Sequence, residues 1–103
     1  AAILDLEEAF IGPCAFDLAM AFVGFGWKDG APVPERWNTL LEGYESIRPL
    51  SQQEKDSLPA LHKYATLSIA AWRYWKHVIS EPDETLSGRY FEMFGRLEKE
   101  VIF

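Results

Sequence analysis

Two aspartates near the start of the chain have the residue type and the surroundings for chemistry. Asp5 ends the apolar run that begins at Ala1, and Asp17 lies inside the apolar stretch from Cys14 to Phe25. Carboxylates are rarely buried among apolar side chains unless they are paired or bind a metal ion. Each also has an ordinary structural explanation. Asp5 can be the polar end of a strand, and Asp17 an acid favoured by the positive end of a helix dipole.

The elements that must position these aspartates are a strand and a helix. Residues 1–7 begin as an apolar, strand-like run, and a strand needs a neighbour to satisfy its backbone donors and acceptors. No later segment has the pattern of a partner strand, so we expect the chain to be cut from a longer protein. Residues 14–25 predict a helix that Pro13 opens. This helix is apolar nearly all round, which predicts a central, buried position.

Further helices are predicted along the rest of the chain. Residues 28–32 are rich in turn formers, and a helix then runs from Pro34 to about residue 47. Ser51 and Glu54 have the spacing of a capping box, which starts a short helix that Pro59 restarts or kinks. The longest helical pattern covers residues 60–79, and the last covers about 84–100. The residues expected to be buried include Phe16, Met20, Phe22, Leu67, Ala71 and Leu97.

Composition excludes several classes of protein. Nearly half of the 103 residues are hydrophobic (49%), which argues against disorder. The net charge of −6 argues against nucleic acid or an anionic membrane surface as a partner. The single cysteine, Cys14, excludes an intramolecular disulfide and a thiolate metal cluster. No signal peptide and no apolar run of about twenty residues is visible, so we expect a soluble, cytoplasmic protein.

The segments Leu4–Glu8, Gly12-Pro13 and Phe16–Ala19 together resemble a signature of the aminoglycoside phosphotransferase, choline kinase and homoserine-kinase-like superfamily, which has a protein-kinase-like fold. The two aspartates are twelve residues apart, as in that signature. The strong motif covers residues 3–21. A looser similarity to a helix of the substrate lobe covers residues 70–75.

The resemblance implies a role for each aspartate. Asp5 would bind the Mg²⁺ ion that bridges the phosphates of ATP, and Asp17 would brace the catalytic loop by hydrogen bonds without touching substrate. Mg²⁺ prefers carboxylate oxygens and usually takes only one or two from protein. The implied cofactors are therefore Mg²⁺ and ATP, with Asp5 as the metal and cofactor residue.

Parts of the implied active site are missing. The only histidines are His62 and His77, and neither is followed two residues later by an aspartate, so the general base of the family is absent. A glycine-rich loop and a phosphate-binding lysine are absent too. We therefore expect no catalytic residue in this fragment and no activity from it alone, and we expect the N-terminal kinase lobe of the same protein as its partner.

Other residues are candidates for binding a small, amine-bearing acceptor. Glu7 and Glu8 offer negative charge, while Trp27, Trp72 and Trp75 offer aromatic faces to a cation. Aromatic residues at helical spacing are more often part of a core, and exposed acids are more often simply solvated. His62, His77 and Cys14 are interpreted as surface or packing residues.

The predicted fold class is mainly α, a C-terminal helical subdomain of a protein-kinase-like C-lobe with one short N-terminal strand. Residues 1–7 would carry the metal-binding aspartate on the strand, and residues 13–103 would form the helical subdomain. The parent enzyme would transfer the γ-phosphoryl group of ATP to a hydroxyl of an amino alcohol, a hydroxy amino acid or an aminoglycoside. The alternative is a non-enzymatic helical interaction module, in which the aspartate spacing is coincidence.

Overall fold

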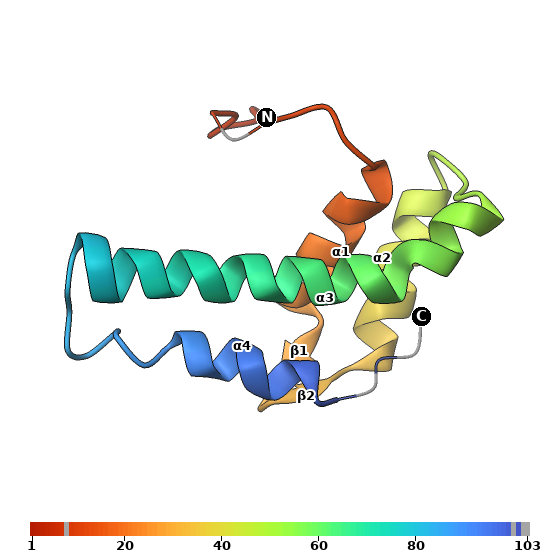
Figure 1. Cartoon of the computed structure of the whole chain (residues 1–103). Coiled ribbons are helices and arrows are strands. Elements are labelled where there is room, and N and C mark those ends of the chain that lie inside the picture. Colours follow the sequence, from red (N-terminus) through yellow and green to blue (C-terminus); the bar gives the residue numbers. More distant parts are fainter. Residues whose placement is uncertain (8, 100, 102–103) are drawn as a thin grey trace.

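The computed structural model describes residues 1–7, 9–99 and 101, and these residues form a mainly helical protein. The long helix α3 (Gln52–Tyr74) runs through the molecule, with α1 and α4 packed on it. α2 packs against α1 near the first turns of α3 (Figure 1). This arrangement confirms the mainly helical class that the sequence predicts.

Helix α1 (Cys14–Phe25) has the bounds that the sequence predicts and the buried position expected from its apolar surface. Pro13 precedes its first turn in an extended conformation. Buried side chains of α1 contribute to both of the core clusters described below. This is because the helix has almost no polar face to turn toward water. The central position predicted for this helix is therefore confirmed.

A short hairpin follows α1 where the sequence predicted only a turn-rich loop. Strand β1 (Trp27–Lys28) pairs antiparallel with β2 (Ala31–Pro32), with Trp27 opposite Pro32. The connecting residues Asp29 and Gly30 have φ angles of 51° and 78°. Two consecutive positive φ angles are typical of the two-residue turns that match the twist of paired strands, and Asp-Gly is a preferred sequence for them.

The boundaries of the next two helices follow from their first residues. Pro34 opens α2 (Pro34–Glu45), which ends slightly before the predicted residue 47. At the start of α3 the predicted capping box is formed. The hydroxyl of Ser51 accepts from the N–H of Glu54 at 3.2 Å, and the carboxylate of Glu54 accepts from the N–H of Ser51 at 3.1 Å.

Pro59 lies inside α3 and does not divide it into two helices, so of the two outcomes expected there, a restart or a kink, the restart does not occur. Its ring removes one backbone hydrogen bond and bends the helix without ending it. The first turns of α3 accordingly run at an angle to its long remainder (Figure 1). Beyond Tyr74 the helix continues as a wider π-helical segment, η1 (Trp75–Ser80).

Two predicted elements differ from the structure. The strand over residues 1–7 is not formed, because no neighbouring strand lies within the described residues to accept and donate its backbone hydrogen bonds. The last helix, α4, covers Tyr90–Leu97 and not 84–100. Residues 84–89 form successive turns instead, and the Asp83 carboxylate accepts from the N–H and the hydroxyl of Thr85. Such local side-chain bonds compete with a helix.

Two clusters form the core. The larger cluster lies where α1, the hairpin, α2 and the first half of α3 meet, and it contains Ala15, Leu18, Phe22, Trp27, Trp37, Leu50 and Leu58. The smaller cluster joins α1, α3 and α4 through Val23, Ala65, Ala70 and Met93. Trp37 is 2% exposed and meets the ring of Phe22 edge to face, with 5.4 Å between ring centroids.

The residues predicted to be buried differ in how far the structure buries them. Phe22 is buried as predicted, and Phe16, Met20 and Leu97 are half-buried. Leu67 and Ala71 are exposed, so the prediction is wrong for both. They lie opposite the face of α3 on which Leu58, His62 and Ala65 are buried, and periodicity alone does not show which apolar face of a helix is covered. Within the described residues, no helix combines the length and apolar character that a membrane crossing requires.

Candidate functional site

The segment before α1 holds Asp5 in an irregular backbone. Asp5 has a φ angle of 62°, in the left-handed region that few residues other than glycine adopt. Aspartate tolerates this region better than most residues, because its short side chain can interact with the local backbone. A turn follows, closed by a hydrogen bond from the N–H of Ala9 to the carbonyl of Leu6 at 3.0 Å. The carboxylate of Asp5 is exposed.

The two motif aspartates lie at one shallow cavity of about 320 Å³. Asp17 reaches it from the first turn of α1, and Asp5 from the irregular segment. The remaining wall consists of Leu6, Ala9, Phe10, Gly12, Pro13 and Phe16. The structure therefore brings together the two residues that the sequence singled out, on a surface where both carboxylates are accessible.

The donor set at this cavity fits a Mg²⁺ ion held partly by other ligands. Carboxylate oxygens are the protein ligands that Mg²⁺ prefers, and one or two are usual when water and phosphate oxygens complete the octahedron. Among the described residues, no group of three or more His, Cys, Asp or Glu side chains is arranged to hold a metal ion. A Mg²⁺ ion bound by one or both of these carboxylates would have its remaining positions open to water or to phosphate oxygens.

The other predicted site residues are distributed over the molecule. Glu7 is exposed in the turn after Asp5, and Glu8 lies outside the described residues. Trp72 lies in the last turn of α3 and Trp75 is the first residue of η1, and they are 55% and 52% exposed. Of the described candidates, only Asp5 and Asp17 line the cavity before α1.

Trp27 lies in the core, where it forms a cluster with a histidine and an arginine. Its indole N–H donates to Nε2 of His62 at 3.3 Å, and the two rings stack with centroids 5.9 Å apart. The guanidinium of Arg96 lies over the indole, 4.9 Å from the ring centroid. A cation therefore already occupies one face of Trp27.

His62 is held neutral by this cluster. It is 5% exposed, and burial together with the positive charge of Arg96 lowers its pKa from 6.5 to about 4. Because Nε2 accepts the indole hydrogen bond, the proton of the neutral ring is assigned to Nδ1. The interpretation of His62 as a packing residue is consistent with this burial. His62 lies four residues after Leu58 and four residues before Thr66, and both of these residues are buried. This spacing is the signal in the sequence that could have placed His62 on the buried face of α3.

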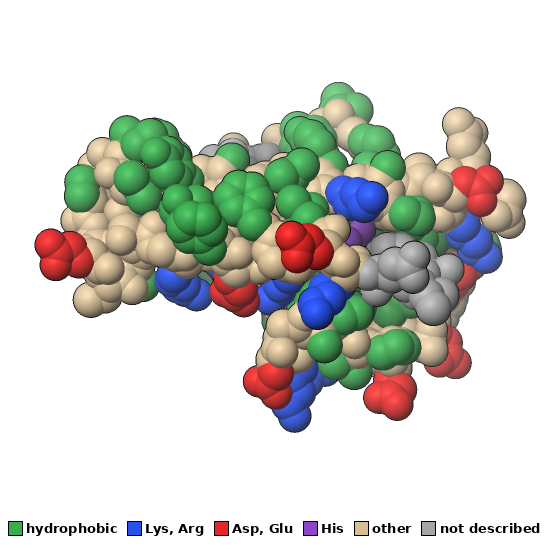
Figure 2. All heavy atoms as spheres, turned by 60° about the horizontal axis from the view of Figure 1, so that its bottom comes forward, with side chains coloured by type: hydrophobic (Ala, Val, Ile, Leu, Met, Phe, Trp, Pro, Cys, Tyr) green, Lys and Arg blue, Asp and Glu red, His purple; other side chains and the backbone are tan. Residues whose placement is uncertain are grey.

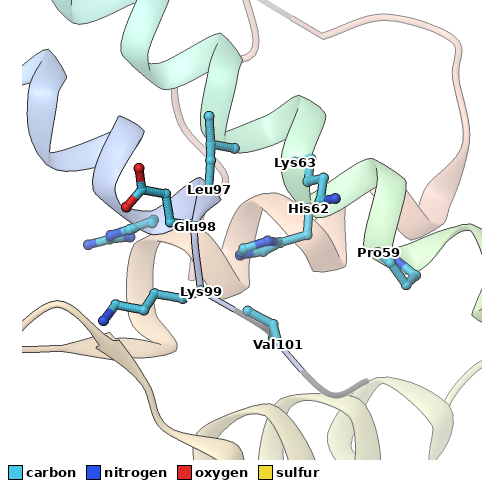
Figure 3. Close-up of a pocket in the computed structure, with 8 residues that line it drawn as sticks. Pro59, His62, Lys63, Leu97, Glu98, Lys99 and Val101 are labelled. Carbon is cyan, nitrogen blue, oxygen red and sulfur yellow. The ribbon is translucent and has the colours of Figure 1, made fainter.

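A second cavity of about 270 Å³ opens beside this cluster. The side chain of His62 projects from α3 toward the segment that carries Glu98 and Lys99 (Figure 3). Lys63, Lys99 and Arg96 make its lining cationic. The guanidinium of Arg96 is already bound, because it donates to the carbonyl of Val23 at 2.7 Å and to the carboxylate of Glu92 at 3.1 Å. Its charge thus ties α4 to α1.

Comparison with known proteins finds similarity to three bacterial homoserine kinases. The protein of Agrobacterium fabrum is 32% identical over 74 residues, which are 71% of this chain and 23% of the relative. That of Gluconobacter oxydans is 29% identical over 82 residues, 79% of this chain and 26% of the relative. That of Xanthobacter autotrophicus is 35% identical over 72 residues, 69% of this chain and 22% of the relative.

The chain thus spans about a quarter of the length of the curated relatives it matches. No family model and no solved structure matches it significantly. The similarity supports a relationship to kinase-like small-molecule phosphotransferases.

Proposed function

We propose that this chain is the C-terminal helical part of an ATP-dependent kinase that phosphorylates the hydroxyl of a small amine-bearing molecule. The observation that carries the proposal is the shared cavity of Asp5 and Asp17, the two residues whose spacing resembles the phosphotransferase signature. Among the acceptor classes that the sequence suggests, the names of the three relatives favour a hydroxy amino acid such as homoserine.

In this proposal the two aspartates have different tasks. Asp5 would hold Mg²⁺, and the metal would supply positive charge that stabilises the transferring phosphoryl group. Asp17, on the first turn of α1, braces a neighbouring loop by accepting its N–H groups. During transfer the γ-phosphorus forms a bond to the acceptor oxygen and breaks its bond to ADP. The acceptor proton passes to a general base that these 103 residues do not provide.

The acidic and aromatic candidates are assigned by where they lie. Trp72 and Trp75 present exposed ring faces, which suits contact with an ammonium group. Glu7 and Glu8 would add negative charge near the acceptor. Trp27 is removed from the acceptor site in this proposal, because its ring is engaged by His62 and Arg96.

The test uses a polypeptide of the relatives' length that contains this chain. Asp5→Asn should reduce turnover at least about a hundredfold while leaving the melting temperature unchanged, because an exposed side chain loses only its metal-binding charge. Turnover is measured with homoserine, amino alcohols, aminoglycosides and neutral sugars as acceptors. Glu42→Gln, which removes an exposed carboxylate on α2, is the matched control and should leave turnover intact.

Near-normal turnover of Asp5→Asn would refute the metal role. The absence of any ATP-dependent phosphorylation by the longer polypeptide would favour the rival interpretation of a helical interaction module. The 103-residue chain alone should transfer no phosphoryl group and should bind Mg²⁺ only weakly, since it lacks the base and the phosphate-binding lobe.

A further inference from the structure

The face of α3 opposite its buried side is apolar and largely exposed. Tyr64, Leu67, Ala71 and Tyr74 follow one another at spacings of three or four residues and are all exposed. We call these four residues the outer face. It lies opposite the core face of the same helix, where Leu58, His62 and Ala65 are buried. A helix with apolar residues on opposite sides is typical of a buried position between two layers.

The outer face is continuous with a larger apolar surface. Leu67, Ala71 and Tyr74 also line a cavity of about 520 Å³ whose other wall includes Tyr90 and Phe94 of α4. Figure 2 shows hydrophobic side chains gathered along α3 and over the end of the molecule where α3 leads toward α4. No residue of the outer face and none lining this cavity is charged. An occupant must therefore be apolar, because a charged group would be desolvated there without a partner.

The outer face leads directly to the candidate site. The ring of Tyr64 contacts that of Phe16 edge to face, with centroids 5.6 Å apart, and Phe16 lies 6.2 Å from Phe10. Phe10 and Phe16 are both in the wall of the cavity that holds Asp5 and Asp17. A segment packed along the outer face would consequently arrive beside the two carboxylates.

We propose that the outer face of α3 is the docking site for an apolar helix of the same phosphotransferase, from outside these 103 residues. This inference rests on the proposed function and adds the surface through which the missing part is attached. Two observations select this occupant over a second copy of the chain. The relatives are about four times as long as the region they share with it, and the apolar surface ends at the carboxylates that need further ligands.

The spacing of the outer face also suits a helix as the occupant. Rows of residues three and four apart form the ridges and grooves through which helices interlock, with axes about 8–10 Å apart. The small side chain of Ala71, between Leu67 and Tyr74, allows a close approach at the middle of the row. Docking there would give α3 helices on both sides, which accounts for its apolar character on two faces.

Cysteine labelling tests the inference independently of activity. In a Cys14→Ser background, Ala71→Cys places a thiol on the outer face, and Asn38→Cys places a matched control thiol on the exposed surface of α2. In the 103-residue chain both thiols should react with a maleimide at similar rates. In the longer polypeptide Ala71→Cys should react at least about tenfold more slowly, because labelling would require local opening, while Asn38→Cys should be unchanged.

Equal labelling of Ala71→Cys in the short and the longer polypeptide would overturn the inference. Slow labelling in the short chain that becomes faster on dilution would also overturn it, because a second copy would then cover the face. Loss of phosphoryl transfer with protection intact would count against the proposed function alone, so the two failures are distinguishable.

Discussion

Along the first half of α3, from Gln52 to Thr66, four side chains are buried, whereas from Leu67 to Ser80 only Ala70 is buried in this fully described stretch. Both halves are helical and both are rich in apolar residues. The first half packs against the larger core cluster. The second half, with η1, presents Trp72, Tyr74, Trp75 and Ile79 to solvent.

Helix formation and burial therefore have separate causes in α3. The backbone hydrogen bonds of α3 are local, so the helix persists where nothing covers it. Burial depends on neighbours: the first half packs into the larger cluster with α1, α2 and the hairpin, whereas the second half enters the smaller cluster with α1 and α4 through Ala70. The second half is therefore the part of this molecule that is suited to a further partner.

The largest predicted change in stability comes from a tryptophan in the core, and it is compared with the change from a tryptophan at the other end of the molecule. Trp37→Ala should lower the free energy of unfolding by about 3–5 kcal/mol, because it opens a cavity in the larger cluster. Trp75→Ala should change it by less than about 0.5 kcal/mol, since that ring is half exposed. Urea unfolding of the 103-residue chain, followed by far-UV circular dichroism, measures both.

Equal losses of stability from the two substitutions would show that the far end of the molecule is as well packed as the core. In the longer polypeptide the loss of stability from Trp75→Ala should be larger if a further segment covers this tryptophan.

The second prediction concerns how stability depends on pH through His62, which lies in the first half of α3. The folded-state pKa of His62 is about 4, below its ordinary value of 6.5. Folding therefore favours the neutral form of His62. The contribution of this group to the free energy of unfolding is complete above about pH 6.5 and is lost as the pH falls toward 4. The loss should reach about 3 kcal/mol at most. Thermal melts between pH 7 and about pH 4 measure it.

His62→Gln should flatten this pH dependence, since the amide keeps a polar group near Trp27 and does not titrate. His77→Gln is the matched control and should leave the dependence as it is. A wild-type melting temperature that is constant across this range would show that His62 is less deeply enclosed than its 5% exposure indicates.

The smallest effect concerns the start of α3. Ser51→Ala removes the hydroxyl that accepts from the N–H of Glu54, which should cost about 1 kcal/mol. Ser51→Asp should recover most of it, because aspartate caps the same N–H. Chemical unfolding of both variants measures the cap, and an unchanged midpoint for Ser51→Ala would show that the first turns of α3 are held by packing alone.

Local features of the sequence determined several elements by themselves. Pro13 and Pro34 mark the starts of two helices, and the Ser51 capping box starts the third. These signals act within a few residues, so no distant contact changes them. The Asp29-Gly30 turn was equally local, and the hairpin around it was predictable from that pair. The position of Asp5 and Asp17 at one cavity was predictable only through the resemblance of this segment to a known signature.

Tertiary structure alone decided which apolar surfaces are covered. Leu67 and Ala71 have the periodicity of core residues and are exposed, whereas His62 is polar and is buried beneath Trp27 and Arg96. Residues 1–7 have the pattern of a strand and form none among the described residues, because a strand exists only with a neighbour. Periodicity specifies which residues share a face, but the neighbour that covers the face is set by contacts between distant segments.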